Sequence, residues 1–173
     1  MILESREVTK KYGGKTAVNQ VSLQLEQGLV YAMLGPNGSG KTTWMKMVAG
    51  LVKPTSGEIL YQGNPIGKES KAEIAYMSTE PYFYNWMSVA DVGKYYEDFF
   101  QDFSMEKYRQ MISRMELTED MKAKKLSSGM MAKLKIAVTM SRAAKLYLLD
   151  EPLNGIDLLA RDQIMKSILE AID

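Results

Sequence analysis

The 173-residue sequence contains no cysteine and no histidine. The absence of cysteine excludes disulfide bonds and thiolate metal sites. A protein without disulfide bonds is compatible with a reducing compartment. No apolar run approaches the roughly 18 residues that a helix needs to cross a bilayer. The 22 Lys and Arg nearly balance the 21 Asp and Glu, so no broad basic field indicates nucleic acid or an anionic membrane surface. What remains is a globular composition, 46% hydrophobic and 25% charged, and a length suited to one domain with its own core.

Apolar periodicity predicts the order of the secondary structure. Val21, Leu23 and Leu25 alternate with polar residues, which is the period of a half-buried strand. Further strands are expected at "LVYAML" (29–34), "SGEILYQG" (56–63), "EIAYM" (73–77) and "KLYLL" (145–149). Helices are expected at 42–50 with Gly50 as the stop, from Ser88 to about Ala144 with Ser88 and Ser104 as caps, and at 157–172 with Asp157 as N-cap. This order indicates an α/β domain around a largely parallel sheet, with a helical subdomain inserted at about 82–144.

The segment "LGPNGSGKTT" (34–43), here called the phosphate loop, follows an apolar run and precedes a predicted helix. Its Gly35, Gly40, Lys41 and Thr42 match G-x-x-x-x-G-K-[ST]. Backbone N–H groups can wrap a polyphosphate only if the loop curls tightly and carries little bulk, which glycine allows. The N–H groups at the start of the next helix face the same anion. We therefore predict a phosphate-binding site, with Lys41 on the β- and γ-phosphates and Thr42 on Mg²⁺.

A second motif, "LYLLDEP" (146–152), places two carboxylates at the end of an apolar strand. Asp150 suits a residue that holds magnesium through water. Glu151 can orient or deprotonate an attacking water. Taken by itself, this motif could be a solvated acidic turn. Its presence in the same chain as the phosphate loop favours nucleotide hydrolysis.

A third motif narrows the class of P-loop protein. "LSSGM" (126–130), the signature segment, resembles the LSGGQ signature of ATP-binding cassette (ABC) ATPases, and "LNGID" (153–157) resembles their D-loop. "KKYGGKTAVNQVSLQLEQG" and "KPTSGEILYQG" resemble the segments on either side of the family's Walker A loop. The resemblance runs in order over essentially the whole chain, and it implies a P-loop NTPase fold with an N-terminal antiparallel β subdomain.

The resemblance implies an ATP-binding subunit of an ABC transporter that hydrolyses Mg-ATP between two cassettes. Glu151 would be the catalytic residue. ATP would be bound by Tyr12, which stacks on adenine, and by Val18, Gly35, Pro36, Asn37, Gly38, Ser39, Gly40, Lys41, Thr42 and Thr43. Ser127, Ser128 and Gly129 would contact the nucleotide of the other protomer, with Asn154 and Asp157 in the D-loop. Mg²⁺ would be held by Thr42 and, through water, by Asp150.

This chain departs from the family pattern at three positions. Ser128 replaces a glycine and Met130 a glutamine in the signature segment, while Ser127 and Gly129 remain. Thr79 occupies the place of the Q-loop glutamine, a further metal contact in the family. Thr79 has a shorter reach, and Glu80 is the alternative.

The resemblance also carries expectations about partners and location. It implies a second cassette, identical or different, and a separate transmembrane subunit, with no role for nucleic acid. The location would be cytoplasmic, peripheral on the inner face of the cell membrane. The "LNGID" region resembles bacterial export-type cassettes. The alternatives are a soluble ABC protein and a regulatory ATP-binding module with little turnover. The chain stops before the family's switch histidine, so we expect a single ABC domain over 1–173, incomplete at its C-terminal end, that binds ATP and hydrolyses it slowly.

Aromatic residues concentrate between Tyr76 and Phe103. Tyr82, Phe83, Tyr84 and Trp86 are expected in a loop, where they form a candidate docking surface for the membrane subunit. A core role within the helical subdomain is expected for Tyr95, Tyr96, Phe99, Phe100 and Phe103.

Overall fold

The computed structural model describes residues 1–80 and 82–172, so Pro81 and Asp173 lie outside the described part. The chain divides into two compact units, residues 1–74 and the residues from Ala75 onward.

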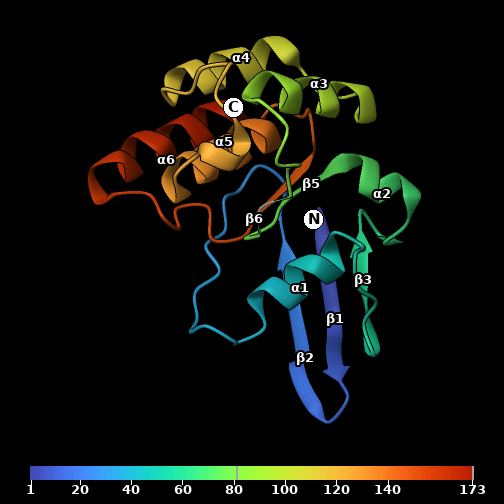
Figure 1. The fold of residues 1–173 in the computed structure, drawn as a ribbon. Coiled ribbons are helices and arrows are strands. Elements are labelled where there is room, and N and C mark those ends of the chain that lie inside the picture. The colour runs from blue at the N-terminus through green and yellow to red at the C-terminus, as the bar shows by residue number, and fades with distance from the viewer. Residues whose placement is uncertain (81, 173) are drawn as a thin grey trace. The chain divides into compact units, whose positions relative to one another are not determined.

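The first unit is built on a four-stranded sheet in the order β2-β1-β3-β4, in which each neighbouring pair is antiparallel (Figure 1). The strands are β1 (Leu3–Tyr12), β2 (Lys15–Leu25), β3 (Ser56–Tyr61) and β4 (Asn64–Pro65), and the helices are α1 (Lys41–Val48) and α2 (Lys68–Glu73). The expected antiparallel subdomain is thereby confirmed. Gly13, at a φ of 55°, lies in the tight turn that joins β1 to β2.

Helix α1 is fixed on the sheet by its buried face. Trp44, Met47 and Val48 are buried, and the Trp44 Nε1–H donates to the buried Ser5 Oγ of β1 at 3.0 Å. The helix ends at Ala49, followed by Gly50 with a φ of 69°, as its sequence predicts. This packing positions the segment that precedes α1.

The prediction of a buried strand at residues 29–34 is wrong. No strand is assigned there, and Leu29, Val30 and Leu34 are more than 60% exposed. The Tyr31 hydroxyl instead accepts from the backbone N–H of Glu26 at 2.9 Å. An apolar run becomes a strand only where another strand satisfies its N–H and C=O groups, and among the described residues no strand pairs with this run.

The second unit combines a small sheet with a group of helices. Strand β5 (Ile74–Met77), which begins at the unit boundary, pairs with β6 (Leu146–Leu149). Among the described residues, these two strands are the part of the expected central sheet that is present. The helices are α3 (Val89–Phe99), α4 (Met105–Arg114), a 3₁₀ turn (Ala123–Lys125), α5 (Ser128–Met140) and α6 (Leu158–Ile172). Helices α3 to α6 pack together (Figure 1). Their core centres on α5, whose Leu134, Ile136 and Met140 are fully buried.

The predicted helix starts in this unit are confirmed. Ser88 Oγ accepts from the Asp91 N–H and Ser104 Oγ from the Lys107 N–H, so both serines cap their helices. The N–H of Ala160 donates to Asp157 Oδ1 at 3.0 Å, in line with the expected cap of α6.

The aromatic residues of α3 differ in part from the prediction. Phe103 is buried, but Tyr95 is 37% and Phe99 66% exposed, so a core role for these two is wrong. They continue a row of exposed rings: Trp86 stacks on Tyr84, Tyr84 meets Tyr95 edge-on, and Tyr95 contacts Phe99. The periodic pattern of α3 cannot show which of its apolar faces meets another helix. We call Tyr84, Trp86, Tyr95 and Phe99 the aromatic row.

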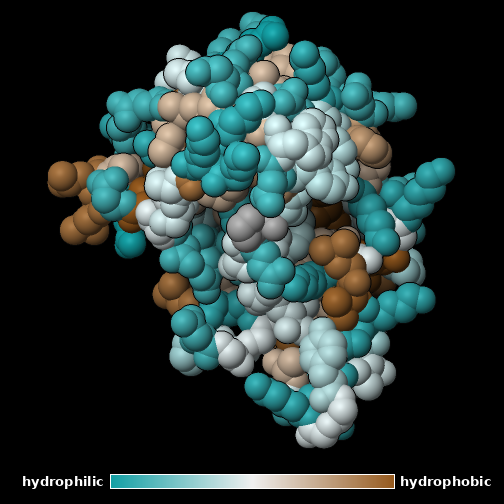
Figure 2. Space-filling view, viewed as in Figure 1, coloured by the Kyte–Doolittle hydropathy of each residue, from teal (hydrophilic) through white to brown (hydrophobic). Residues whose placement is uncertain are grey.

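Two leucines stand out on the surface at the start of α6. Leu158 is 78% and Leu159 92% exposed. Figure 2 shows hydrophobic atoms at its left edge, over this end of α6. Among the residues that the structure describes, no helix is both long and apolar enough to span a membrane.

Candidate nucleotide-binding site

The phosphate loop runs directly into α1. Gly40 precedes the helix with a φ of 94°, and no side chain caps the helix end. The first N–H groups of a helix have no partner within it, so those of Lys41, Thr42 and Thr43 are donors for an anion. The first turn contains no acidic residue. The Ser39 N–H donates to Pro36 O at 3.2 Å and closes a tight turn before the helix.

Gly40 is held against strand β2. A Cβ at this position would lie 2.3 Å from the carbonyl oxygen of Ala17 and 3.1 Å from Val18 Cγ2. Together with the positive φ, this approach leaves room only for glycine. Val18, predicted to contact ATP, is therefore buried beside the loop, and the structure brings the two together.

The Lys41 side chain folds back onto the start of the loop. Its ammonium donates to Gly35 O at 2.7 Å and to Pro36 O at 2.9 Å. A cation in this position can exchange carbonyl partners for phosphate oxygens, which form stronger charge-assisted bonds. The loop therefore fits a polyphosphate through backbone donors, a helix N-terminus and one ammonium.

Tyr12 lies at the end of β1 in the same unit. Its ring is half exposed, and the Lys10 ammonium lies 5.0 Å from the ring centroid. An exposed aromatic face can stack on a nucleobase.

We expect Tyr12→Ala to weaken ATP binding by roughly 1–3 kcal/mol, the contribution of a base–aromatic stack. Calorimetric titration with ATP measures the change. Tyr12→Phe is the matched control, because it keeps the ring and should bind like the parent. An affinity unchanged by the alanine would assign Tyr12 to the hairpin surface alone.

In the second unit, Asp150 follows β6 and is only 2% exposed. Its N–H donates to Met77 O at 3.1 Å, and the Tyr76 hydroxyl donates to Asp150 Oδ2 at 3.4 Å. Burial, with the nearby Asp150 charge, raises the pKa of Tyr76 to about 12, so this hydroxyl remains a donor near neutral pH. Strand pairing and this hydroxyl together orient the Asp150 carboxylate.

Glu151 is exposed and has a φ of 48°, in the left-handed region that glutamate rarely adopts. Asn154 stabilises this turn: its backbone N–H donates to Glu151 O at 3.0 Å and its Nδ2 to Glu151 Oε2 at 3.3 Å. The D-loop residue Asn154 therefore orients the predicted catalytic carboxylate.

The signature segment opens α5. Ser127 Oγ accepts from the Met130 N–H at 3.2 Å and caps the helix. Gly129 has a second role that the sequence did not reveal, because a Cβ there would lie 2.8 Å from the carbonyl oxygen of Gly155. A Cβ on Gly155, whose φ is 79°, would lie 3.1 Å from the Ser128 side chain. The signature segment and the D-loop are thus packed backbone to backbone.

Sequence reasoning missed one buried charge. Lys135 of α5 is only 6% exposed, and its ammonium donates to the carbonyl oxygens of Ser78 and Thr79, at 2.7 Å each. A lysine within the apolar stretch "LKIAV" (134–138) was the available clue. The structure thus places Thr79, at the Q-loop position, in contact with the signature helix.

The donor set suits Mg²⁺ bound together with a nucleotide rather than a metal held by protein alone. Within residues 1–80 and 82–172, no three acidic, histidine or cysteine side chains form a metal cluster. Mg²⁺ in nucleotide sites is usually held by one or two protein oxygens, phosphates and water. Thr42 and Asp150 are of the type required.

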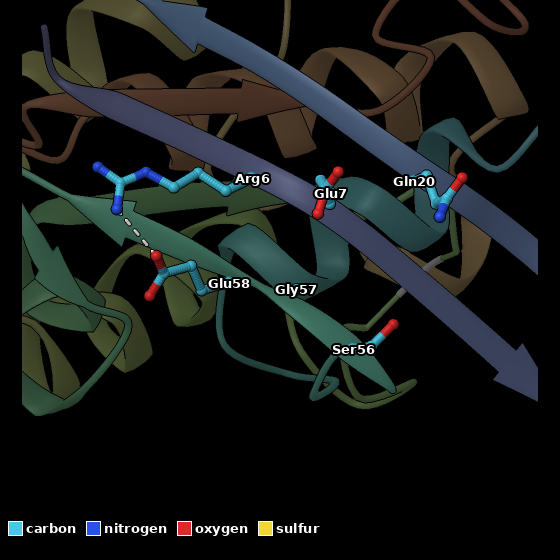
Figure 3. A pocket seen from close by; sticks show the side chains of 6 residues that line it. All are labelled: Arg6, Glu7, Gln20, Ser56, Gly57 and Glu58. Carbon is cyan, nitrogen blue, oxygen red and sulfur yellow. Dashed lines mark hydrogen bonds and ion pairs between the residues drawn. The ribbon is translucent and has the colours of Figure 1, made fainter.

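A shallow recess of the antiparallel sheet lies at an irregular stretch of β1 (Figure 3). Its cation is already paired, since Arg6 donates to Glu58 at 2.9 Å and to Glu4 at 2.7 Å. A Cβ on Gly57 would lie within 2.6 Å of the backbone of Arg6 and Glu7. The recess lies where two strands approach closely, and none of the residues that line it is a predicted site residue.

Comparison with known proteins settles the class of this chain. Residues 18–154 match the family model described as "ABC transporter". The chain belongs to the ABC transporter family. This ABC protein is 32% identical over 169 residues to the lantibiotic transport ATP-binding protein SrtF of Streptococcus pyogenes, covering 96% of this chain and 73% of SrtF. It is 29% identical over 173 residues to the ABC transporter ATP-binding protein YtrB of Bacillus subtilis (strain 168), covering 99% of this chain but only 59% of YtrB.

The fold of the ABC protein is confirmed by solved structures. An ATP-binding protein from Pyrococcus furiosus assigned to an ABC transporter superimposes with a TM-score of 0.87 at 30% identity, over 99% of this chain and 86% of the other. The predicted P-loop NTPase class is therefore correct.

Proposed function

We propose that this chain binds Mg-ATP and hydrolyses it to power an ABC transporter. The observation that carries the proposal is the phosphate loop, with its uncapped helix start and the Lys41 ammonium bonded to Gly35 and Pro36. In this proposal Tyr12 and Val18 contact the adenosine, and residues 35–43 hold the phosphates. Thr42 and Asp150 hold Mg²⁺, which neutralises charge on the phosphates during their transfer.

Glu151 acts as the general base in this proposal. Its carboxylate accepts the proton of the attacking water, while Asn154 fixes its orientation. The side chain is exposed, as a group that must meet a substrate requires. The close packing of Gly129 on Gly155 supports a joint role of signature segment and D-loop, in which Ser127, Ser128 and Gly129 contact ATP bound to a second cassette.

The aromatic row is the proposed docking surface for a transmembrane subunit. Four exposed rings in mutual contact form a surface of the kind that protein partners bury. Tyr82, 38% exposed and in contact with Phe83, adjoins this row in sequence. Export is the proposed direction, on the strength of the "LNGID" segment. Assembly at a membrane would make the protein cytoplasmic and peripheral.

Trp86→Ala should weaken association with the membrane subunit and leave ATP binding intact, because the ring lies outside the nucleotide-binding residues. The complete protein is co-purified with its membrane subunit, and phosphate release is compared with and without that subunit in vesicles. Phe83→Ala is the matched control: the sequence assigned Phe83 to the same docking surface, but the structure leaves it only partly exposed and packs it against the core, outside the aromatic row. Unchanged co-purification and unchanged stimulation of the Trp86 variant would reject this surface.

A regulatory ATP-binding module with little turnover is the second candidate. Met130 in the signature segment and Thr79 at the Q-loop position favour it. Phosphate release by the complete protein separates the two functions, because a module that only binds ATP stays at the background rate at saturating Mg-ATP.

A further inference from the structure

Lys135 is a buried cation that the functions above do not use. It lies on α5 between Leu134 and Ile136, both fully buried. Lysine is almost never this buried unless its charge is paired or solvated by hydrogen bonds. Here the carbonyl oxygens of Ser78 and Thr79 supply two such bonds.

The ammonium belongs to a connected group of polar atoms around Asp150. Burial lowers the pKa of Lys135, and the Asp150 carboxylate opposes that decrease, so the two charges interact. Asp150 is bonded in turn to Met77 through its backbone and to Tyr76 through its carboxylate. The segment from Tyr76 to Thr79 is thus bonded to Asp150, the proposed metal ligand, at one end and to Lys135 at the other.

Lys135 also connects this group to the signature segment. It follows Ser127 by two turns of α5, about 12 Å along the helix axis. Thr79 lies at the position where the family has its glutamine, and its side chain is too short to replace that residue. Lys135 instead donates to the backbone carbonyl oxygens of this segment, and these bonds do not depend on the side chain at position 79.

Packing alone does not account for a lysine here. An apolar side chain would avoid the free energy of removing an ammonium from water, and such replacements of buried charges are often neutral or stabilising. The neighbouring positions on α5 are already apolar. Because a buried ammonium lowers the free energy of unfolding relative to an apolar side chain, we infer that Lys135 has a role other than stabilising the fold.

We propose that Lys135 is a positioning residue that fastens the Ser78–Thr79 backbone to the signature helix beside Asp150, so that both respond together to ATP. This inference rests on the proposed ATPase function. It predicts that removing the ammonium frees residues 76–80 and slows hydrolysis without weakening ATP binding, because the phosphate loop is built from other residues.

The test uses Lys135→Met in the complete protein, with Lys133→Met as the matched control. Lys133 lies on the same helix, but its ammonium pairs with Glu116 at 3.9 Å. Amide hydrogen exchange over residues 76–80 should become about tenfold faster in Lys135→Met and stay unchanged in Lys133→Met, as expected for losing bonds to a charged donor. With Mg-ATP, kcat should fall about 10–100-fold while the ATP dissociation constant stays within about twofold.

Each readout decides separately. Unchanged exchange at 76–80 in Lys135→Met would overturn the tether whether or not the protein hydrolyses ATP. Faster exchange with parental kcat would overturn the positioning role. A parent that releases no phosphate would reject the proposed ATPase while the exchange data still test the tether. If Lys135→Met does not fold, Lys135→Gln, which keeps a shorter N–H donor, should give intermediate exchange, and parental exchange would overturn the proposal.

Discussion

Replacing Lys41 by alanine should lower the affinity for ATP by about 10²–10³-fold, because it removes hydrogen bonds from a charged donor to phosphate oxygens. The structure supports so large an effect, since the ammonium lies over the loop and bonds to Gly35 and Pro36. Calorimetry with ATP gives the dissociation constant directly. The backbone donors at the start of α1 should leave weak residual binding.

Lys46→Ala is the matched control for this experiment. Lys46 lies in the last turn of the same helix, so its loss changes the net charge equally without touching the phosphate loop. Its dissociation constant should match that of the parent. An equal loss of affinity in both variants would mean that only the general positive charge of α1 matters. Near-parental binding by Lys41→Ala would contradict the assignment of the phosphate site to this loop.

Glu151→Gln should keep ATP binding and reduce hydrolysis by about 10²–10⁴-fold, since an amide cannot accept the proton of the attacking water. The substitution preserves the size of the side chain, and Asn154 can still bond its oxygen. Steady-state phosphate release gives the rate. With hydrolysis stopped, ATP should hold two cassettes together, which light scattering detects.

Asp162→Asn controls for the loss of one negative charge, because Asp162 is exposed on α6 outside the predicted site. It should hydrolyse ATP at the parental rate. If Glu151→Gln also does so, Glu151 is not the general base and the acidic end of β6 serves only to bind metal.

The sequence was most informative where a backbone conformation needs a particular residue. Gly40, pressed against Ala17 at a positive φ, and Ser127, capping α5, have geometries that few residues can adopt, so their motifs predicted them. The caps Ser88 and Ser104 were found for the same reason. Local rules of this kind act within a few residues of sequence.

Contacts between distant segments were not predictable in this way. The sequence of residues 29–34 does not show whether a partner strand will be present. In the structure this run has no partner strand among the described residues and is largely exposed. Tyr95 and Phe99 follow the spacing of a buried helix face, yet only another element could bury them. Lys135 interrupts an apolar helix, and only the structure shows that its hydrogen-bond acceptors, Ser78 and Thr79, lie more than 50 residues away in sequence.

The left-handed backbone of Glu151, the proposed general base, sets stability against the proposed chemistry at one position. Asparagine or glycine would adopt a φ of 48° with less strain, so a redesign guided by backbone geometry alone would replace this glutamate. Engineers who raise the melting temperature of such a chain should therefore exempt residue 151. Conversely, homologous chains with glycine or asparagine in this turn would be ones in which selection for turnover has relaxed.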